Sequence, residues 1–152
     1  MTAKTPGYFR TIRIIHNSFL VRMLFFAATI FFLVRSGKFR PVDSISFDRI
    51  LQVVVLLVAG ILLIVGFRLF KKRIVALHQS PDPAEKKLDQ YRSACISWWA
   101  MIEGPGMVAI ISLLLTSNYA FFVLACFHII ILAFLCHANT ILFFCLTLIR
   151  RK

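Results

Sequence analysis

Residues 95–119 read CISWWAMIEGPGMVAIISLLLTSNY. About 20 consecutive apolar residues cross the hydrocarbon core of a membrane as one helix, and this segment has that length. A single acid, Glu103, interrupts it and is followed directly by Gly104-Pro105-Gly106. The two polar residues Ser117-Asn118 then separate it from another apolar run, which fits only a tight turn between antiparallel helices. The segment therefore predicts a membrane-spanning helical hairpin with a charged side chain inside it.

The composition of the whole chain agrees with a membrane setting. The 152 residues are 60% hydrophobic, and their mean hydropathy is +0.85. A soluble domain of this size has too little interior to bury so much apolar surface. The 18 basic residues exceed the 6 acids and give a net charge of +12, but they lie between the apolar runs. Such a distribution is typical of membrane flanks and argues against a nucleic-acid partner.

The apolar runs predict an all-α, polytopic membrane protein whose residues 1–152 form one four-helix transmembrane domain. The expected spans are residues 14–34, 50–70, 95–116 and 119–148, and residues 71–92 are expected to form a cytoplasmic loop. We expect the third span to be kinked at Gly104-Pro105-Gly106, because proline has no N–H to donate to the preceding turn.

The basic residues predict the orientation of the spans. With four passes, fourteen of the 18 basic residues fall on the side of the two termini and four on the other side. The four on the other side are Arg35, Lys38, Arg40 and Arg49. By the positive-inside rule, both termini are expected in the cytoplasm.

Two local patterns refine the third helix. Asp82-Pro83-Ala84-Glu85 is close to a capping box, with Asp82 as the N-cap, so this helix should begin in the cytoplasm and enter the membrane without a break. Trp98 and Trp99 are expected near the cytoplasmic interface, in the aromatic belt.

A polar layer is the candidate site. Counting along the helices places Glu103, Arg22, His137 and Asn139 at similar depths, near or just cytoplasmic of the membrane midplane. The alternative for Arg22 is a position about one turn inside the cytoplasmic boundary, where its long side chain reaches the headgroups. Glu103 beside a proline-freed carbonyl is typical of a proton or cation site in a broken transporter helix. The other interpretation is a structural carboxyl that is hydrogen-bonded, or paired with Arg22, and fixes helix packing.

Metal, cofactor and catalytic sites are not predicted. The four cysteines have no C-x-x-C spacing and are interpreted as small buried hydrophobes; they are Cys95, Cys126, Cys136 and Cys145. His128 and His137 lie among apolar residues and are expected to hydrogen-bond across helices rather than bind a metal or haem.

Basic residues on the predicted cytoplasmic side are candidates for docking to anionic headgroups or to an acidic partner. They are Lys71, Lys72, Arg73, Lys86 and Lys87.

A resemblance adds to this interpretation. Tyr91-Arg92-Ser93-Ala94, followed by Trp98-Trp99-Ala100-Met101-Ile102-Glu103-Gly104-Pro105, resembles a group of small, uncharacterised four-helix bacterial inner-membrane proteins. The match covers mainly residues 85–119 and implies a bacterial inner-membrane location but no activity. The membrane acid followed by small residues is also faintly similar to proton-carrying rotor subunits of rotary ATPases. Those subunits need helices rich in glycine and alanine, whereas these helices are rich in Phe, Leu and Ile.

The sequence leaves two functions open. The first is an accessory, structural or assembly component of a membrane complex, in contact with copies of itself or with other membrane subunits. The second is a small proton- or cation-coupled transport or channel protein that uses Glu103. An enzyme is a third and weaker interpretation, since no triad, metal cluster or phosphate loop appears in the sequence.

Overall fold

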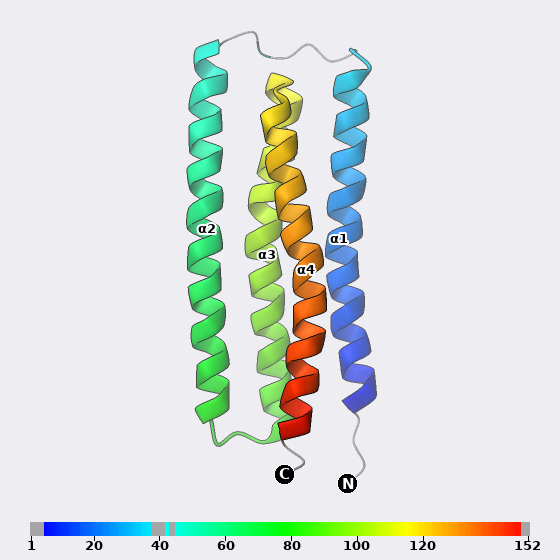
Figure 1. Cartoon of the computed structure of the whole chain (residues 1–152), viewed down its shortest axis with the longest axis vertical. Helices are drawn as coiled ribbons and strands as arrows, with labels where there is room; N and C mark the ends of the chain where they lie inside the picture. The colour runs from blue at the N-terminus through cyan, green and yellow to red at the C-terminus, as the bar shows by residue number, and fades with distance from the viewer. Residues whose placement is uncertain (1–4, 38–41, 43–44, 150–152) are drawn as a thin grey trace.

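The chain is all-helical in the computed structural model. The structure describes residues 5–37, 42 and 45–149, with the side chains of residues 10–37, 42, 45–83 and 85–135. The helices are α1 (Thr5–Arg35), α2 (Ile45–Gln79), α3 (Ala84–Thr116) and α4 (Tyr119–Ile149). Successive helices run in opposite directions, so α1 begins and α4 ends at the same end of the bundle (Figure 1). We call this the basic end, because Arg10, Arg13 and the Lys71-Lys72-Arg73 run lie there.

Three helices in the described part of the chain are long and apolar enough to cross a membrane. They comprise Arg10–Arg35, Ile45–Gln79 and Glu85–Thr116, and the described apolar part of α4, Tyr119–Leu135, is shorter. The expectation of an all-helical protein with several candidate membrane spans is therefore confirmed, which indicates a membrane protein. The fourth span and the kink in α3 stay predictions.

The helices extend further than the apolar runs. α2 continues to Gln79 and α3 begins at Ala84, so most of the predicted cytoplasmic connection, residues 71–92, is helical, as expected for its part after Ala84. Its cytoplasmic location stays a prediction. Only residues 80–83 connect the two helices, because lysine and arginine are good helix formers and the helices continue beyond their apolar segments. The unbroken path of α3 through residue 95 and the two-residue turn at Ser117-Asn118 are both confirmed.

The start of α3 differs from the predicted cap. Pro83, not Asp82, is the N-cap residue; its backbone is extended and no side chain caps the helix. The Asp82 carboxylate instead accepts a hydrogen bond from Lys86 Nζ at 2.9 Å. This bond and one involving Ser80 lower the pKa of Asp82 below its ordinary value. The prediction of Asp82 as the N-cap is therefore wrong.

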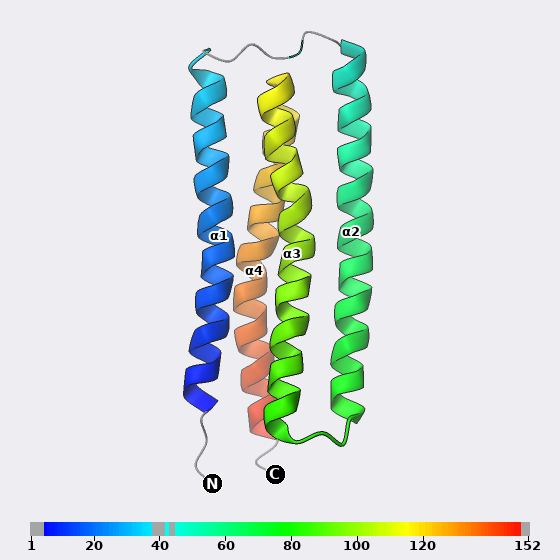
Figure 2. The same cartoon turned by 180° about the vertical axis from the view of Figure 1, so that it is seen from behind.

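Helix α3 is the centre of the bundle. It packs against all three other helices, and α1 also packs against α4. No extended packing joins α1 to α2 within the described ranges. Figure 2 shows α3 between α1 and α2, with α4 behind.

The interior consists of two apolar clusters with a polar layer between them. One cluster, around Met23, Ile110 and Phe121, lies toward the α3–α4 turn. The other, around Trp99, Ile102 and Leu132, lies toward the basic end. The α3 residues between the two clusters are Glu103 to Gly106, so the sequence feature that interrupts the apolar run also divides the core.

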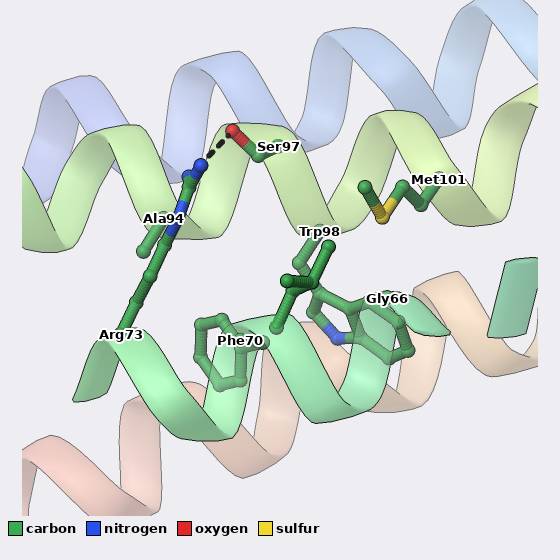
Figure 3. A pocket seen from close by; sticks show the side chains of 8 residues that line it. Gly66, Phe70, Arg73, Ala94, Ser97, Trp98 and Met101 are labelled. Atoms are coloured by element: carbon green, nitrogen blue, oxygen red, sulfur yellow. Dashed lines mark hydrogen bonds between the residues drawn. The ribbon is translucent and has the colours of Figure 1, made fainter. Parts of the chain in front are cut away.

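Close packing of α2 on α3 depends on a glycine opposite a tryptophan. The ring of Trp98 lies over Gly66 and stacks on Phe70, with ring centroids 6.2 Å apart (Figure 3). Trp98 and Trp99 are both buried among helices, so their rings pack inside the bundle rather than on its surface. Their position near the cytoplasmic interface stays a prediction. Tertiary packing against Gly66 and His16 determines their positions.

Candidate functional site

The site is an ion pair between the middle of α1 and the middle of α3. Arg22 donates from Nε to Glu103 Oε1 at 2.8 Å, and its Nη2 contacts both carboxylate oxygens. This forked arrangement matches the planar guanidinium to the planar carboxylate and is among the stronger hydrogen-bonding geometries in proteins. Residues distant in the sequence are thereby fixed at one level of the bundle.

The two partners differ in exposure. The Glu103 side chain is 8% exposed, whereas that of Arg22 is 62% exposed. The guanidinium carbon of Arg22 lies over the Phe19 ring, 5.1 Å from its centroid. At this distance a cation–π interaction between the guanidinium and the ring is favourable. The carboxylate is therefore covered by the guanidinium, and the guanidinium faces the outside of the bundle.

The glycines beside Glu103 have different roles. A Cβ at Gly106 would collide with Met23 of α1 and come within 3.1 Å of His128 Cβ on α4, so its missing side chain lets three helices meet. A Cβ at Gly104 would meet nothing within 4 Å. α3 continues through Pro105, which has no N–H for the carbonyl of Met101.

Two buried histidines flank the ion pair along the bundle. Across helices, Nε2 of His16 lies 2.9 Å from the Leu132 carbonyl, and the His16 ring packs edge-on against Trp99 with centroids 4.8 Å apart. His128 Nδ1 lies 2.9 Å from the Leu124 carbonyl of its own helix, so the expectation that His128 bonds across helices is wrong. The second ring nitrogen of each histidine and Nε1 of Trp99 are buried with no hydrogen-bond partner among the described residues.

His16 is a polar core residue that the sequence analysis missed. It lies two helical turns before Met23 and therefore on the same face of α1, which is the apolar face that packs against α3 and α4. That spacing is the signal that could have placed it in the core.

Of the four residues predicted to share a polar layer, the structure brings Arg22 and Glu103 together. The side chains of His137 and Asn139 lie outside the described residues. Along α4, Leu132 lies beside His16, and positions 137 and 139 follow it by roughly 8–10 Å toward the basic end. Their participation with Glu103 stays a prediction.

The predicted docking residues lie at the basic end. Arg73 of α2 donates from Nη1 to Ser97 Oγ of α3 at 3.1 Å, beside the packed rings of Phe70 and Trp98 (Figure 3). Lys86 pairs with Asp82, while Lys71 and Lys72 are exposed. The Arg73–Ser97 contact joins α2 to α3, and the exposed lysines leave positive charge on the surface.

No group of three potential metal ligands converges among the described side chains. Cys95 is buried and Cys126 partly buried, and both are free thiols, while the side chains of Cys136 and Cys145 lie outside the described residues. The described ionisable groups at the site are the Glu103 carboxylate and the Arg22 guanidinium.

Comparison with known protein families, curated protein sequences and solved structures finds no match for this chain.

Proposed function

We propose that the chain is an integral protein of the bacterial inner membrane, crosses it four times with both termini in the cytoplasm, and acts as an accessory, structural or assembly component of a membrane complex. The concentration of basic residues where α1 begins, α2 ends and α3 begins supports this orientation. The apolar lengths of α1, α2 and α3 support the membrane setting.

The Arg22–Glu103 pair is the observation that favours a structural role. A carboxylate that exchanges protons or cations during transport must reach water in at least one state. Here the carboxylate is buried, and both of its oxygens contact the same guanidinium. Separating the pair would leave a buried charge without a partner, which is costly in a medium of low dielectric constant. The pair therefore holds α1 and α3 in one register.

A second candidate is proton- or cation-coupled transport through Glu103, with His137 and Asn139 as further participants. The exposure of the Arg22 side chain favours it, because movement of Arg22 away from α3 would uncover the carboxylate on that side. Such movement is a specific requirement of transport and is absent from the structural role.

Reconstitution into vesicles separates the two candidates. Under the structural role, vesicles containing the wild-type chain take up protons and potassium no faster than empty vesicles. In membranes, Glu103→Gln then weakens association with the partners that copurify with the wild type in mild detergent. Glu85→Gln, an exposed acid at the start of α3, is the matched control and should leave association unchanged.

Wild-type ion flux that disappears in Glu103→Gln while assembly is unchanged would replace the structural role with transport. Flux that persists in Glu103→Gln would argue against both, since neither candidate gives the bundle a pathway independent of this carboxylate.

A further inference from the structure

We propose that the groove between α2 and α3 near the basic end binds one anionic phospholipid, with the lipid phosphate on Arg73 and an acyl chain along Phe70 and Trp98. We call it the α2–α3 groove. The proposal rests on the membrane setting proposed above and assigns a ligand to a site that the Arg22–Glu103 pair does not use.

The α2–α3 groove has a polar end and an apolar end. Arg73 and Ser97 lie at the end nearer the basic end of the bundle, and Gly66 and Met101 lie at the other (Figure 3). The remaining lining is apolar and consists of Leu69, Phe70, Ala94 and Trp98. From Gly66 to Arg73 the groove follows α2 for roughly 10 Å.

The size of the groove suits part of a long ligand. Its empty space, with the open side included, is about 220 Å³. Pockets that enclose a whole small molecule have roughly 300–1,000 Å³. The α2–α3 groove is therefore too small to enclose a solute, but one extended chain can lie along it while the rest of the molecule stays outside.

Arg73 supplies a charge with no acid opposite it. Its Nη1 donates to Ser97 Oγ at 3.1 Å, and it forms no ion pair with the side chains that the structure describes. The Ser97 hydroxyl itself donates to the Ser93 carbonyl at 2.9 Å, so its oxygen is held where Arg73 can reach it. Ser97 is thus a positioning residue for the guanidinium. A guanidinium has five N–H donors, and those left over match the oxygens of a phosphate group.

The depth of Arg73 fits a lipid phosphate. The apolar run of α2 ends at Phe70, and Arg73 lies roughly 4–5 Å further along the helix. On α3, Arg92 precedes the apolar segment, and Ser97 lies roughly 7 Å inside it. Because Arg73 turns toward Ser97, its guanidinium lies at the level where headgroups meet acyl chains.

The order of groups along the groove identifies the ligand class. From the boundary inward, the groove offers a cation, then the stacked rings of Phe70 and Trp98, then Gly66 and Met101. A phospholipid has the same order, with its phosphate at the boundary and its acyl chains toward the midplane. Basic pockets between membrane helices on the cytoplasmic side bind anionic headgroups in this way.

Other occupants fit less of the groove. A free anion would contact Arg73 and leave the apolar part empty. An acidic segment of a soluble partner would do the same, because the apolar part lies inside the membrane boundary. The neighbouring Lys71 and Lys72 are exposed but do not line the groove, so they attract an anionic surface without holding one molecule in place.

Fluorescence quenching by brominated lipid tests the site, because bromine on an acyl chain quenches a tryptophan that it contacts. Of the two tryptophans in the chain, Trp98 lines the groove, and Trp99→Phe leaves it as the single reporter. The full chain is reconstituted into phosphatidylcholine vesicles that contain a small fraction of brominated phosphatidylglycerol, which is anionic. We expect several-fold stronger quenching than from the same fraction of brominated phosphatidylcholine.

Neutralising Arg73 tests its role in the preference. Arg73→Gln should reduce quenching by the anionic lipid to the level given by brominated phosphatidylcholine. Lys72→Gln is the matched control, because it removes the same charge from an adjacent exposed residue outside the groove. It should keep most of the preference. Equal losses in the two variants would overturn the site, since they would show a general attraction to surface charge.

The source of the phosphate is tested with inorganic phosphate in the buffer, compared with chloride at equal ionic strength. Quenching by the anionic lipid should not change. Relief of quenching by inorganic phosphate would assign Arg73 to a free anion and overturn the lipid site. If Arg73→Gln does not accumulate, the comparison of the two brominated lipids with Arg73 in place still decides, because equal quenching by both overturns the proposal.

Failure of this proposal differs from failure of the accessory role. Absence of a lipid preference would remove the lipid site and leave the association that Glu103→Gln is expected to weaken. Ion flux through the wild-type chain would remove the structural role and leave the lipid preference in place.

Discussion

At the level of single residues, the Glu103 and Arg22 side chains determine how α1 pairs with α3. Their charges compensate each other across two helices that are distant in sequence, and the carboxylate is buried. The sequence predicted that both residues belong to one polar layer, because each lies a similar number of residues from the polar ends of its apolar segment. The forked contact could not be predicted, since it depends on which faces of α1 and α3 meet.

Replacing one of the two charged side chains should therefore reduce the free energy of unfolding more than replacing both. We expect Arg22→Leu to reduce the free energy of unfolding by about 3 kcal/mol, because Glu103 is left buried without its partner. The double variant Arg22→Leu, Glu103→Leu should recover most of this loss. Unfolding in mixed detergent, followed by the fluorescence of Trp98 and Trp99, measures both. Equal losses in the single and double variants would contradict the coupling of the two side chains.

Gly66 allows α2 to approach α3. A Cβ there would lie 2.5 Å from Cζ3 and 2.7 Å from Cε3 of Trp98, so the buried ring would have to move. We expect Gly66→Ala to reduce the unfolding free energy by about 1–3 kcal/mol, the usual cost of overpacking.

Gly60→Ala on the same helix is the control, because nothing lies within 4 Å of the added Cβ. Gly60→Ala should not reduce the unfolding free energy, since alanine is a better helix former than glycine. A Gly66→Ala variant as stable as Gly60→Ala would show that the α2–α3 contact is looser than described.

At the level of helices and connections, the apolar runs located the helices but not their ends. The α3–α4 turn is held by specific contacts: Asn118 Oδ1 accepts from the Ala120 N–H at 2.9 Å, and Asn118 Nδ2 donates to Asp48 of α2 at 2.8 Å. Ser117, in the left-handed region with φ of 55°, donates its N–H to the Leu113 carbonyl. The turn therefore connects α2, α3 and α4 at the end opposite the basic end.

Among the described residues, Ser117 and Gly37 have positive φ, and substitutions at these two positions should have opposite effects. Ser117→Gly removes the steric cost of a side chain at φ of 55° and should stabilise the protein by about 1 kcal/mol. Gly37→Ala adds that cost at φ of +66°, where no neighbouring atom interferes, and should destabilise it by a similar amount. Thermal unfolding in detergent gives both shifts, and changes of equal sign would contradict the assigned conformations.

At the level of the whole molecule, antiparallel helices bring the start of α1 and the end of α4 to one end of the bundle, where the basic residues gather. A membrane therefore meets a strongly basic end and a weakly charged opposite end. The positive-inside rule turns this difference into a predicted orientation.

Thiol labelling in intact cells measures that orientation. Ser36→Cys, after α1, should react with a membrane-impermeant reagent supplied from outside. Gln79→Cys, at the end of α2, should react only after the membrane is permeabilised. The reverse pattern would invert the proposed orientation, and labelling of both from outside would remove the membrane-spanning arrangement of α2.

The sequence by itself determined the helical class, the positions of the apolar segments, the two-residue turn and the unusual acid at residue 103. It could do so because these features depend on local composition, on segment length and on the cost of charge in an apolar medium. Only the tertiary structure decided that Trp98 fits against Gly66 and that Arg22 covers Glu103 while its outer side stays exposed. Those facts depend on the rotation of each helix about its axis. That rotation is set by the packing of side chains from distant parts of the chain, which no local pattern encodes.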